Sequence, residues 1–199
     1  GSFLALEEHY NSFLPGDQRK DLIWHEINFT DGTSYELTGG GAAGSELKGR
    51  AGYYWLKWIA FDLPPNNGSR DVVLQRLAEL YLILAEAENE INGPTAVAYE
   101  AINTVRRRAF GNDEHDLEGL SKDEFRQAVV QENAWELGGE GWRRFYLWHW
   151  GFETYRAAAE SVKGSLPLLV QNLKPHHQWY KIPIGELTKN PNLEQNPDY

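Results

Sequence analysis

The chain has 199 residues, a formal net charge of −10 and a hydrophobic content of 41%. This length and hydrophobicity fit one folded domain, or part of a larger one, and exclude global disorder. The acidic excess argues against binding to nucleic acid or to anionic lipid, because both would need a basic face. The chain contains no cysteine, which excludes disulfides, thiolate nucleophiles and cysteine metal sites.

No apolar stretch approaches the ~20 residues that are needed to span a bilayer. No charged-then-apolar signal segment opens the chain either. Because the sequence begins with Gly1-Ser2 and contains no methionine, we expect it to be a piece of a longer protein. The missing targeting signal then says nothing about where the full protein is located.

Residues 1–69 are predicted to be rich in loops and short strands. A loose alternation of apolar and polar residues favours a strand at residues 22–29. Glycine dominates residues 31–49, which favours a loop. The triplet Gly39-Gly40-Gly41 is not followed by the Gly-Lys-Ser/Thr of a phosphate-binding loop, so no phosphate site is expected there.

An aromatic run at residues 52–58 has the composition of a further strand. Because side chains alternate between the two faces of a strand, one face carries Tyr54 and Leu56 and is expected to meet the core. The other face carries Tyr53 and Trp55 and is expected to meet solvent.

A helical core is predicted for residues 70–160. Apolar residues recur with helical spacing between Val73 and Ile91 and widen to more than one side, so we expect this helix to be sandwiched between neighbours. Gly93-Pro94 ends it, and a second periodic stretch leads into the triplet Arg106-Arg107-Arg108. The pair is typical of a tetratricopeptide-like hairpin, which must stack on other helices to bury its apolar surface.

A third helix begins with a capping box, in which Ser121 and Glu124 satisfy each other's backbone N–H groups. After a Gly-Gly stop, a densely aromatic helix is expected over residues 142–159. Residues 161–199 are predicted to form an irregular, proline-punctuated tail with one strand at residues 178–182.

Glu132 and Glu136 lie one turn apart on the apolar stripe of the third helix and are the most suggestive catalytic pair. Two carboxylates that bracket a glycosidic bond would make a glycoside hydrolase. Alternatively, buried carboxylates need cationic partners, which Arg106–Arg108, Arg143 or Arg144 could supply. We favour the structural role, because side chains one turn apart leave little room for a sugar ring between them.

The six histidines show no HExxH or similar spacing, and no Gly-x-Ser-x-Gly elbow is present, so neither a metal site nor a cofactor is expected. The remaining signal is the aromatic excess, with eight Trp and ten Tyr. Exposed rings stack on the apolar face of a sugar while polar neighbours bind its hydroxyls. We therefore select Trp24, Tyr53 and Trp55 as candidate glycan-binding residues.

Three stretches together resemble the SusD/RagB family of outer-membrane glycan-capture lipoproteins. They are the helix pair with its arginine triplet at residues 76–111, the block QENAWELGGEGWRRFYLWHWG at residues 131–151, and the ending with IP and NPNL motifs at residues 182–199. Tyr146 and His149 depart from the family pattern and replace an Asp and an Arg, which predicts a Tyr–His contact in place of a helical ion pair. Asp198 replaces a customary Gly.

The resemblance implies a mainly α fold of tetratricopeptide-type helical hairpins with a few short strands and long loops. It implies that residues 1–199 are the C-terminal portion of a SusD-like domain, with a lipid anchor on the missing N-terminus. It also implies a non-enzymatic protein on the cell outer membrane that binds an oligosaccharide or polysaccharide and delivers it to a SusC-like TonB-dependent transporter. It carries over no ligand residues, because the shared motifs belong to the scaffold. A helical-repeat scaffold for protein–protein interaction is the third interpretation.

Overall fold

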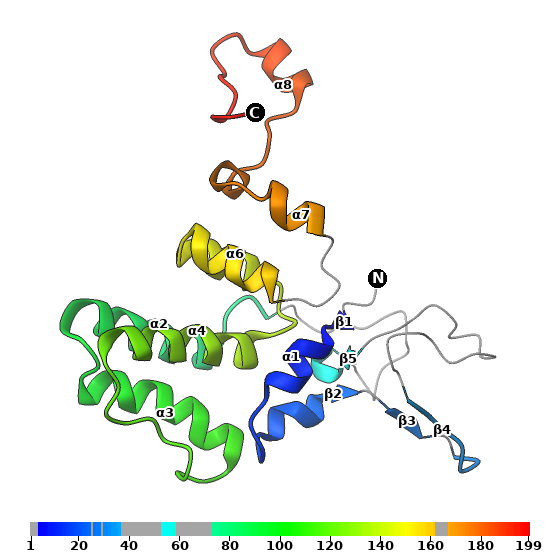
Figure 1. Cartoon of the computed structure of the whole chain (residues 1–199), viewed down its shortest axis with the longest axis vertical. Helices are drawn as coiled ribbons and strands as arrows, with labels where there is room; N and C mark the ends of the chain where they lie inside the picture. Colours follow the sequence, from blue (N-terminus) through cyan, green and yellow to red (C-terminus); the bar gives the residue numbers. More distant parts are fainter. Residues whose placement is uncertain (1–3, 25, 29, 37–52, 59–72, 162–166) are drawn as a thin grey trace. The chain divides into compact units, whose positions relative to one another are not determined.

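The structure is a computed structural model that describes residues 4–24, 26–28, 30–36, 53–58, 73–161 and 167–199 (Figure 1). The chain divides into two units, residues 1–141 and residues 142–199, and each is described by itself.

Three long helices, of 16, 15 and 16 residues, lie in the first unit. α2 (Leu77–Asn92) packs on both α3 (Ala96–Phe110) and α4 (Lys122–Leu137), as Figure 1 shows. α2 ends at Gly93, whose φ of 83° lies in the region that favours glycine. α3 begins at Thr95, whose side chain accepts a hydrogen bond from the backbone N–H of Ala98. The predicted hairpin and its Gly-Pro stop are therefore confirmed.

α2 buries one face and exposes another. The buried face includes Leu82 and Ala85. Other leucines of its predicted apolar pattern are exposed, at 64% for Leu77, 48% for Leu80 and 45% for Leu84. α2 thus has the two neighbours expected, α3 and α4, but part of its apolar surface stays uncovered within the part of the chain that the structure describes.

α4 begins as predicted. The Ser121 backbone N–H donates to Glu124 Oε2 at 2.8 Å, and the Ser121 hydroxyl accepts from the Glu124 backbone N–H at 3.3 Å, which completes the capping box. The stripe that follows is buried along its whole length, at Phe125, Val129, Glu132 and Glu136. α4 thus places two carboxylates in the interior of the unit.

A three-stranded antiparallel sheet has the order β1 (Leu4–Ala5), β5 (Tyr53–Trp55) and β2 (Ile23–Trp24). A second, two-stranded sheet pairs β3 (Glu26–Asn28) with β4 (Ser34–Glu36). Short helical segments flank the strands: α1 (Glu7–Ser12), the 3₁₀ turn η1 (Gln18–Leu22) and the 3₁₀ turn η2 (Leu56–Trp58). The strand expected at residues 22–29 therefore exists as two strands in two different sheets. Of the loop expected at residues 31–49, residues 34–36 form β4, and residues 37–49 lie outside the described residues.

The register of the three-stranded sheet reverses the predicted faces of β5. Trp55 lies opposite Ile23 and Tyr53 lies opposite Ala5, so these four residues share one face. That face packs into a core in which Trp55 is 8% exposed and Tyr53 is partly buried. The prediction that Tyr53 and Trp55 face solvent is wrong. The strand also ends at Trp55, because Leu56 continues into η2.

The second unit contains α5 (Arg143–His149), α6 (Phe152–Glu160), α7 (Pro167–Asn172), η3 (Pro175–Gln178) and α8 (Ile184–Lys189). The single helix expected at residues 142–159 is broken at Gly151, whose φ is 100°. The rings of Tyr146 and His149 both lie near Trp150, with centroids 5.6 Å and 6.4 Å from its ring. Asp198 has a φ of 65°, which explains physically why glycine would suit its position.

The strand predicted at residues 178–182 is wrong. The backbone of Ile182 bonds to a side-chain amide in place of a neighbouring strand, since Gln195 Oε1 accepts from its N–H at 2.9 Å and Gln195 Nε2 donates to its carbonyl at 3.0 Å. Asn196 Nδ2 donates to the Tyr180 carbonyl at 2.7 Å in the same way. Side chains of the C-terminal residues thus form the hydrogen bonds that the backbone of this extended segment would otherwise make to a neighbouring strand.

Candidate functional site

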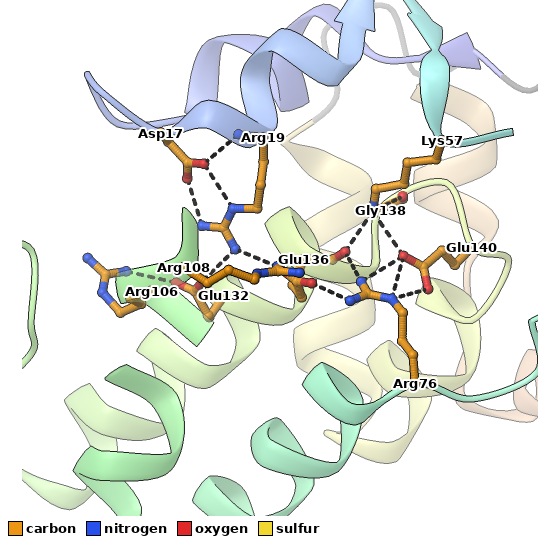
Figure 2. Close-up of polar contacts among 10 residues, drawn as sticks. All are labelled: Asp17, Arg19, Lys57, Arg76, Arg106, Arg108, Glu132, Glu136, Gly138 and Glu140. Carbon is orange, nitrogen blue, oxygen red and sulfur yellow. Dashed lines mark hydrogen bonds and ion pairs between the residues drawn. The ribbon is translucent and has the colours of Figure 1, made fainter. Parts of the chain in front are cut away.

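Glu132, the first acid of the suspected catalytic pair, has a guanidinium on each carboxylate oxygen. Arg19 Nη1 donates to Oε1 at 2.6 Å, and Arg106 Nη1 donates to Oε2 at 2.7 Å. Glu132 is 0% exposed. Arg19 comes from η1 and Arg106 from α3, so this one carboxylate connects three segments of the first unit (Figure 2).

Glu136, one turn further along α4, has three cationic partners. Arg76 donates to Oε1, while Arg108 Nη2 and Arg19 Nη1 donate to Oε2. Burial alone would raise the pKa of Glu136, but the charges of Arg108, Arg76 and Arg19 outweigh burial and lower that pKa below its ordinary value. The side chain therefore stays ionised at neutral pH although it is buried.

Arg19 lies at the centre of these contacts. Its guanidinium donates from Nε and Nη2 to the two oxygens of Asp17 at 2.9 Å and 2.7 Å, in a bidentate arrangement. Burial lowers the pKa of Arg19, but the hydrogen bonds and charges of Asp17 and Glu132 more than offset it and raise that pKa overall. Asp17 also accepts from the Arg19 backbone N–H at 3.0 Å, which fixes the start of η1.

A second cluster of charges surrounds the C-terminal end of α4. Lys57 Nζ donates to the carbonyl of Glu136 at 2.6 Å, to the carbonyl of Gly138 at 3.1 Å and to Glu140 Oε1 at 2.9 Å. Arg76 donates from Nε and Nη2 to the same Glu140 carboxylate. Burial lowers the pKa of Lys57, and Glu140 offsets part of this effect. Cations at this position suit the negative end of the helix dipole.

Together these side chains form what we call the charge network, drawn in Figure 2: Asp17, Arg19, Lys57, Arg76, Arg106, Arg108, Glu132, Glu136 and Glu140. The contacts of the network join α4 to other segments of the first unit and are typical of a structural role. A catalytic acid at neutral pH needs a raised pKa and access to substrate, whereas Glu136 has a lowered pKa and both acids are at most 2% exposed.

The predicted pairing of the two acids with the arginine triplet is confirmed for Arg106 and Arg108. The other two suggested sources have different contacts in the second unit. Arg144 donates to the Tyr180 hydroxyl and to the His177 carbonyl, and Arg143 Cζ lies 5.7 Å from the ring centroid of Trp150. Sequence reasoning missed Arg19 and Arg76 as partners. Arg19 lies in the charged segment Asp-Gln-Arg-Lys-Asp at residues 17–21, but nothing in that segment points to a partner on α4.

The three candidate glycan-binding residues do not form one site. Tyr53 stacks on Tyr10 with ring centroids 4.7 Å apart, and Trp55 is in the core beside Gly139. Trp24 follows Ile23 in β2, so it lies on the opposite face of the sheet, where it is 38% exposed. Of the three, Trp24 is the most exposed.

A hollow of about 400 Å³, which the sequence did not indicate, lies on the surface of the first unit. It is lined by one continuous stretch, from Phe13 to Gln18 together with Lys20 and Asp21. This size is within the ~300–1,000 Å³ that is usual for small-molecule sites. The hollow therefore adds a second candidate site to the exposed ring of Trp24.

The described residues contain neither a metal cluster nor a membrane-spanning helix. Among them, no three His, Asp or Glu side chains are grouped so that they could hold a metal ion. Within the same ranges, no helix has the length and apolar character that crossing a membrane demands.

Comparison with known proteins places this geometry in a family. Residues 24–199 match the sequence model described as the SusD family. The SusD-like protein P25 of Formosa agariphila is 40% identical over 131 residues, which are 65% of this chain and 24% of that protein. The chain thus spans about a quarter of the length of this relative.

Solved structures show the same fold. A SusD homologue from Bacteroides thetaiotaomicron has a TM-score of 0.70 and 28% identity, covering 92% of this chain and 41% of its own. A SusD-like carbohydrate-binding protein from Bacteroides vulgatus has a TM-score of 0.53 and 25% identity, covering 73% of this chain and 27% of its own. The predicted fold class, mainly α with helical hairpins and a few short strands, is confirmed. With the family model matching most of its length, the chain belongs to the SusD family.

Proposed function

We propose that this chain is part of a protein that binds an oligosaccharide or polysaccharide without hydrolysing it. The observation that carries the proposal is the family match over residues 24–199, together with the likeness to a protein described as a SusD-like carbohydrate-binding protein. The state of the acid pair supports binding without turnover, because Glu132 and Glu136 are buried and held by guanidiniums.

The test is electrophoresis of the chain through gels that contain single polysaccharides, with analysis of the same polysaccharides for released oligosaccharides. We expect retardation in at least one gel and no product. Product formation that is lost in Glu132→Gln or Glu136→Gln would favour the glycoside hydrolase instead. Absence of retardation across the panel would overturn carbohydrate binding and favour the protein–protein scaffold.

Trp24 is the residue of the sequence-based site that we retain, because its ring is partly exposed while Trp55 is buried. If Trp24 stacks on the ligand, Trp24→Ala weakens retardation by roughly 10- to 100-fold, the equivalent of ~1.5–3 kcal/mol. The matched control is Trp179→Ala, a more exposed tryptophan in the second unit, which we expect to leave retardation unchanged.

We further propose that the full protein is anchored by lipid on the cell outer membrane and delivers its ligand to a SusC-like TonB-dependent transporter. Family membership supports this role. The test is affinity purification of the full-length protein from solubilised outer membranes. A co-purifying SusC-like transporter is expected, and a protein recovered alone from the soluble fraction would overturn both parts of the proposal.

A further inference from the structure

The surface hollow of the first unit is built by two local structures that follow directly from the sequence. Leu14-Pro15-Gly16-Asp17 is a β-turn, in which the Asp17 N–H donates to the Leu14 carbonyl at 3.2 Å. Proline at the second position and glycine with a φ of 86° at the third suit a type II turn. η1 follows at once, and its Lys20 N–H donates to the Asp17 carbonyl at 3.2 Å.

The charge network fixes this stretch from the inside. Asp17 and Arg19 are 4% and 6% exposed and point into the network, where Arg19 reaches Glu132 on α4. The residues between and after them, Gln18, Lys20 and Asp21, line the hollow on the outside. A binding surface held in place by a buried network loses little conformational freedom when a ligand binds.

The polar groups that line the hollow are of two kinds: Asp17 is held by Arg19, whereas the other three make no hydrogen bond to the described residues. Among the described residues, the side chains of Gln18, Lys20 and Asp21 neither donate nor accept a hydrogen bond. The Lys20 ammonium lies 4.3 Å from the ring centroid of Tyr10, which in turn stacks on Tyr53. Burial and, after it, the charge of Asp21 raise the pKa of Tyr10.

These groups match the chemistry of a sugar. An amide both donates and accepts, an ammonium donates and a carboxylate accepts, so together they can satisfy hydroxyls that do both. Leu14 and Pro15 supply an apolar surface for the C–H groups of the ring. Asp17 also lines the hollow, but its charge is balanced by Arg19. Lys20 and Asp21 then balance each other, which favours an uncharged sugar over a uronate or a sulfated sugar.

We propose that the hollow between Leu14 and Asp21 binds one unit of a neutral oligosaccharide, with Gln18, Lys20 and Asp21 as its hydrogen-bonding groups. This inference rests on the proposed carbohydrate binding and names a place for it. It assigns the binding site to the N-terminal turn of the first unit, not to the aromatic strand that the sequence suggested.

The test uses calorimetry of the chain with maltohexaose, cellohexaose, xylohexaose, mannohexaose and laminarihexaose, and with hexagalacturonate as the charged arm. Gln18→Ala and Asp21→Ala are each expected to weaken binding of the preferred neutral hexaose by roughly tenfold, the effect of one lost hydrogen bond. Gln127→Ala and Asp113→Ala remove the same side chains from other exposed positions of the first unit and should leave affinity unchanged.

The outcomes separate the site from the function. If a neutral hexaose binds and neither Gln18→Ala nor Asp21→Ala weakens it, the site is wrong while carbohydrate binding stands. Backbone amide shifts on titration that include residues 13–21 would support the site, and shifts that leave residues 13–21 unchanged would overturn it. Binding of hexagalacturonate alone overturns the neutral-sugar assignment. Binding of no saccharide overturns the proposed function and the site together.

Discussion

Two helices of the first unit, α4 and α2, each carry a stripe of side chains with helical spacing, but only the α4 stripe is buried. The stripe of α4 includes Glu132 and Glu136 and is buried. The stripe of α2 is aliphatic, with Leu77, Leu80 and Leu84, and is exposed in the described part of the chain. Helical periodicity therefore identifies a helix but not the face that becomes buried, because burial depends on which partners the rest of the chain supplies.

The partners of the α4 stripe are cations from distant segments. Removing an ionised carboxylate from water costs several kcal/mol, and only close, hydrogen-bonded cations offset that cost. Glu132 has such a cation on each oxygen, and so has Glu136. The leucines of the α2 stripe are exposed in the described part of the chain, so changes to them should have small effects.

The largest effect is expected for Glu132→Ala. The change leaves the guanidiniums of Arg19 and Arg106 buried without their shared carboxylate, and breaking such a pair costs ~3–5 kcal/mol of unfolding free energy. Urea denaturation measures it. Glu118→Ala, at an exposed site of the same unit, is the control and should stay within ~0.5 kcal/mol. A loss below ~1 kcal/mol for Glu132→Ala would mean that the charge network contributes little to the free energy of unfolding.

Gly139→Ala tests how tightly the end of α4 is packed. A Cβ at Gly139 would lie 2.9 Å from the Trp55 ring, and the φ of 79° is unfavourable for any side chain. Overpacking and backbone strain should together destabilise the protein by ~2–4 kcal/mol. Gly141→Ala is the matched control, since its φ is also positive but nothing lies within 4 Å. Equal losses in both variants would show that backbone strain alone acts at Gly139.

The pH dependence should follow the carboxylates of the network. In Glu136 and Glu140, burial raises the pKa, but the neighbouring cations outweigh it, so both pKa values are lower in the folded state. The unfolded chain then binds more protons in acid. The stabilisation they provide is present above the ordinary glutamate pKa and is lost as the pH falls through the lowered values.

Unfolding free energies between about pH 6 and about pH 3 measure this loss. Glu140→Gln removes one titrating group and should make the dependence on pH shallower, while Glu118→Gln at an exposed site should not. An unchanged slope in Glu140→Gln would contradict the assigned lowering of its pKa.

The parts of this fold that the sequence predicted are the local ones. The Gly-Pro stop of α2 and the capping box at Ser121 depend on residues within one turn of each other, so their signals survive without tertiary information. The pairing of the α4 acids with the arginine triplet could also be predicted. Buried carboxylates need cations, and the triplet lies near the C-terminal end of the preceding helix, α3.

The parts that failed depend on contacts across the sequence. The solvent face of Trp55 was assigned wrongly because the register of β5 is fixed by Ala5 and Ile23, which no local pattern reveals. Arg19 was missed because it reaches Glu132 over a separation of 113 residues. The hollow between Leu14 and Asp21 is formed by a local turn and η1, but no sequence pattern shows that such a turn encloses a hollow.

The smallest effect is expected on the α2 stripe, where Leu84→Ala should change the unfolding free energy by less than ~0.5 kcal/mol. Leu82, two residues away on the same helix, is 2% exposed, and Leu82→Ala should cost ~2–5 kcal/mol because it leaves a cavity. Helix propensity changes equally in both variants, so the difference between them isolates burial. If Leu84→Ala costs as much as Leu82→Ala in urea denaturation, the stripe is covered in the folded protein, and the contrast between α2 and α4 disappears.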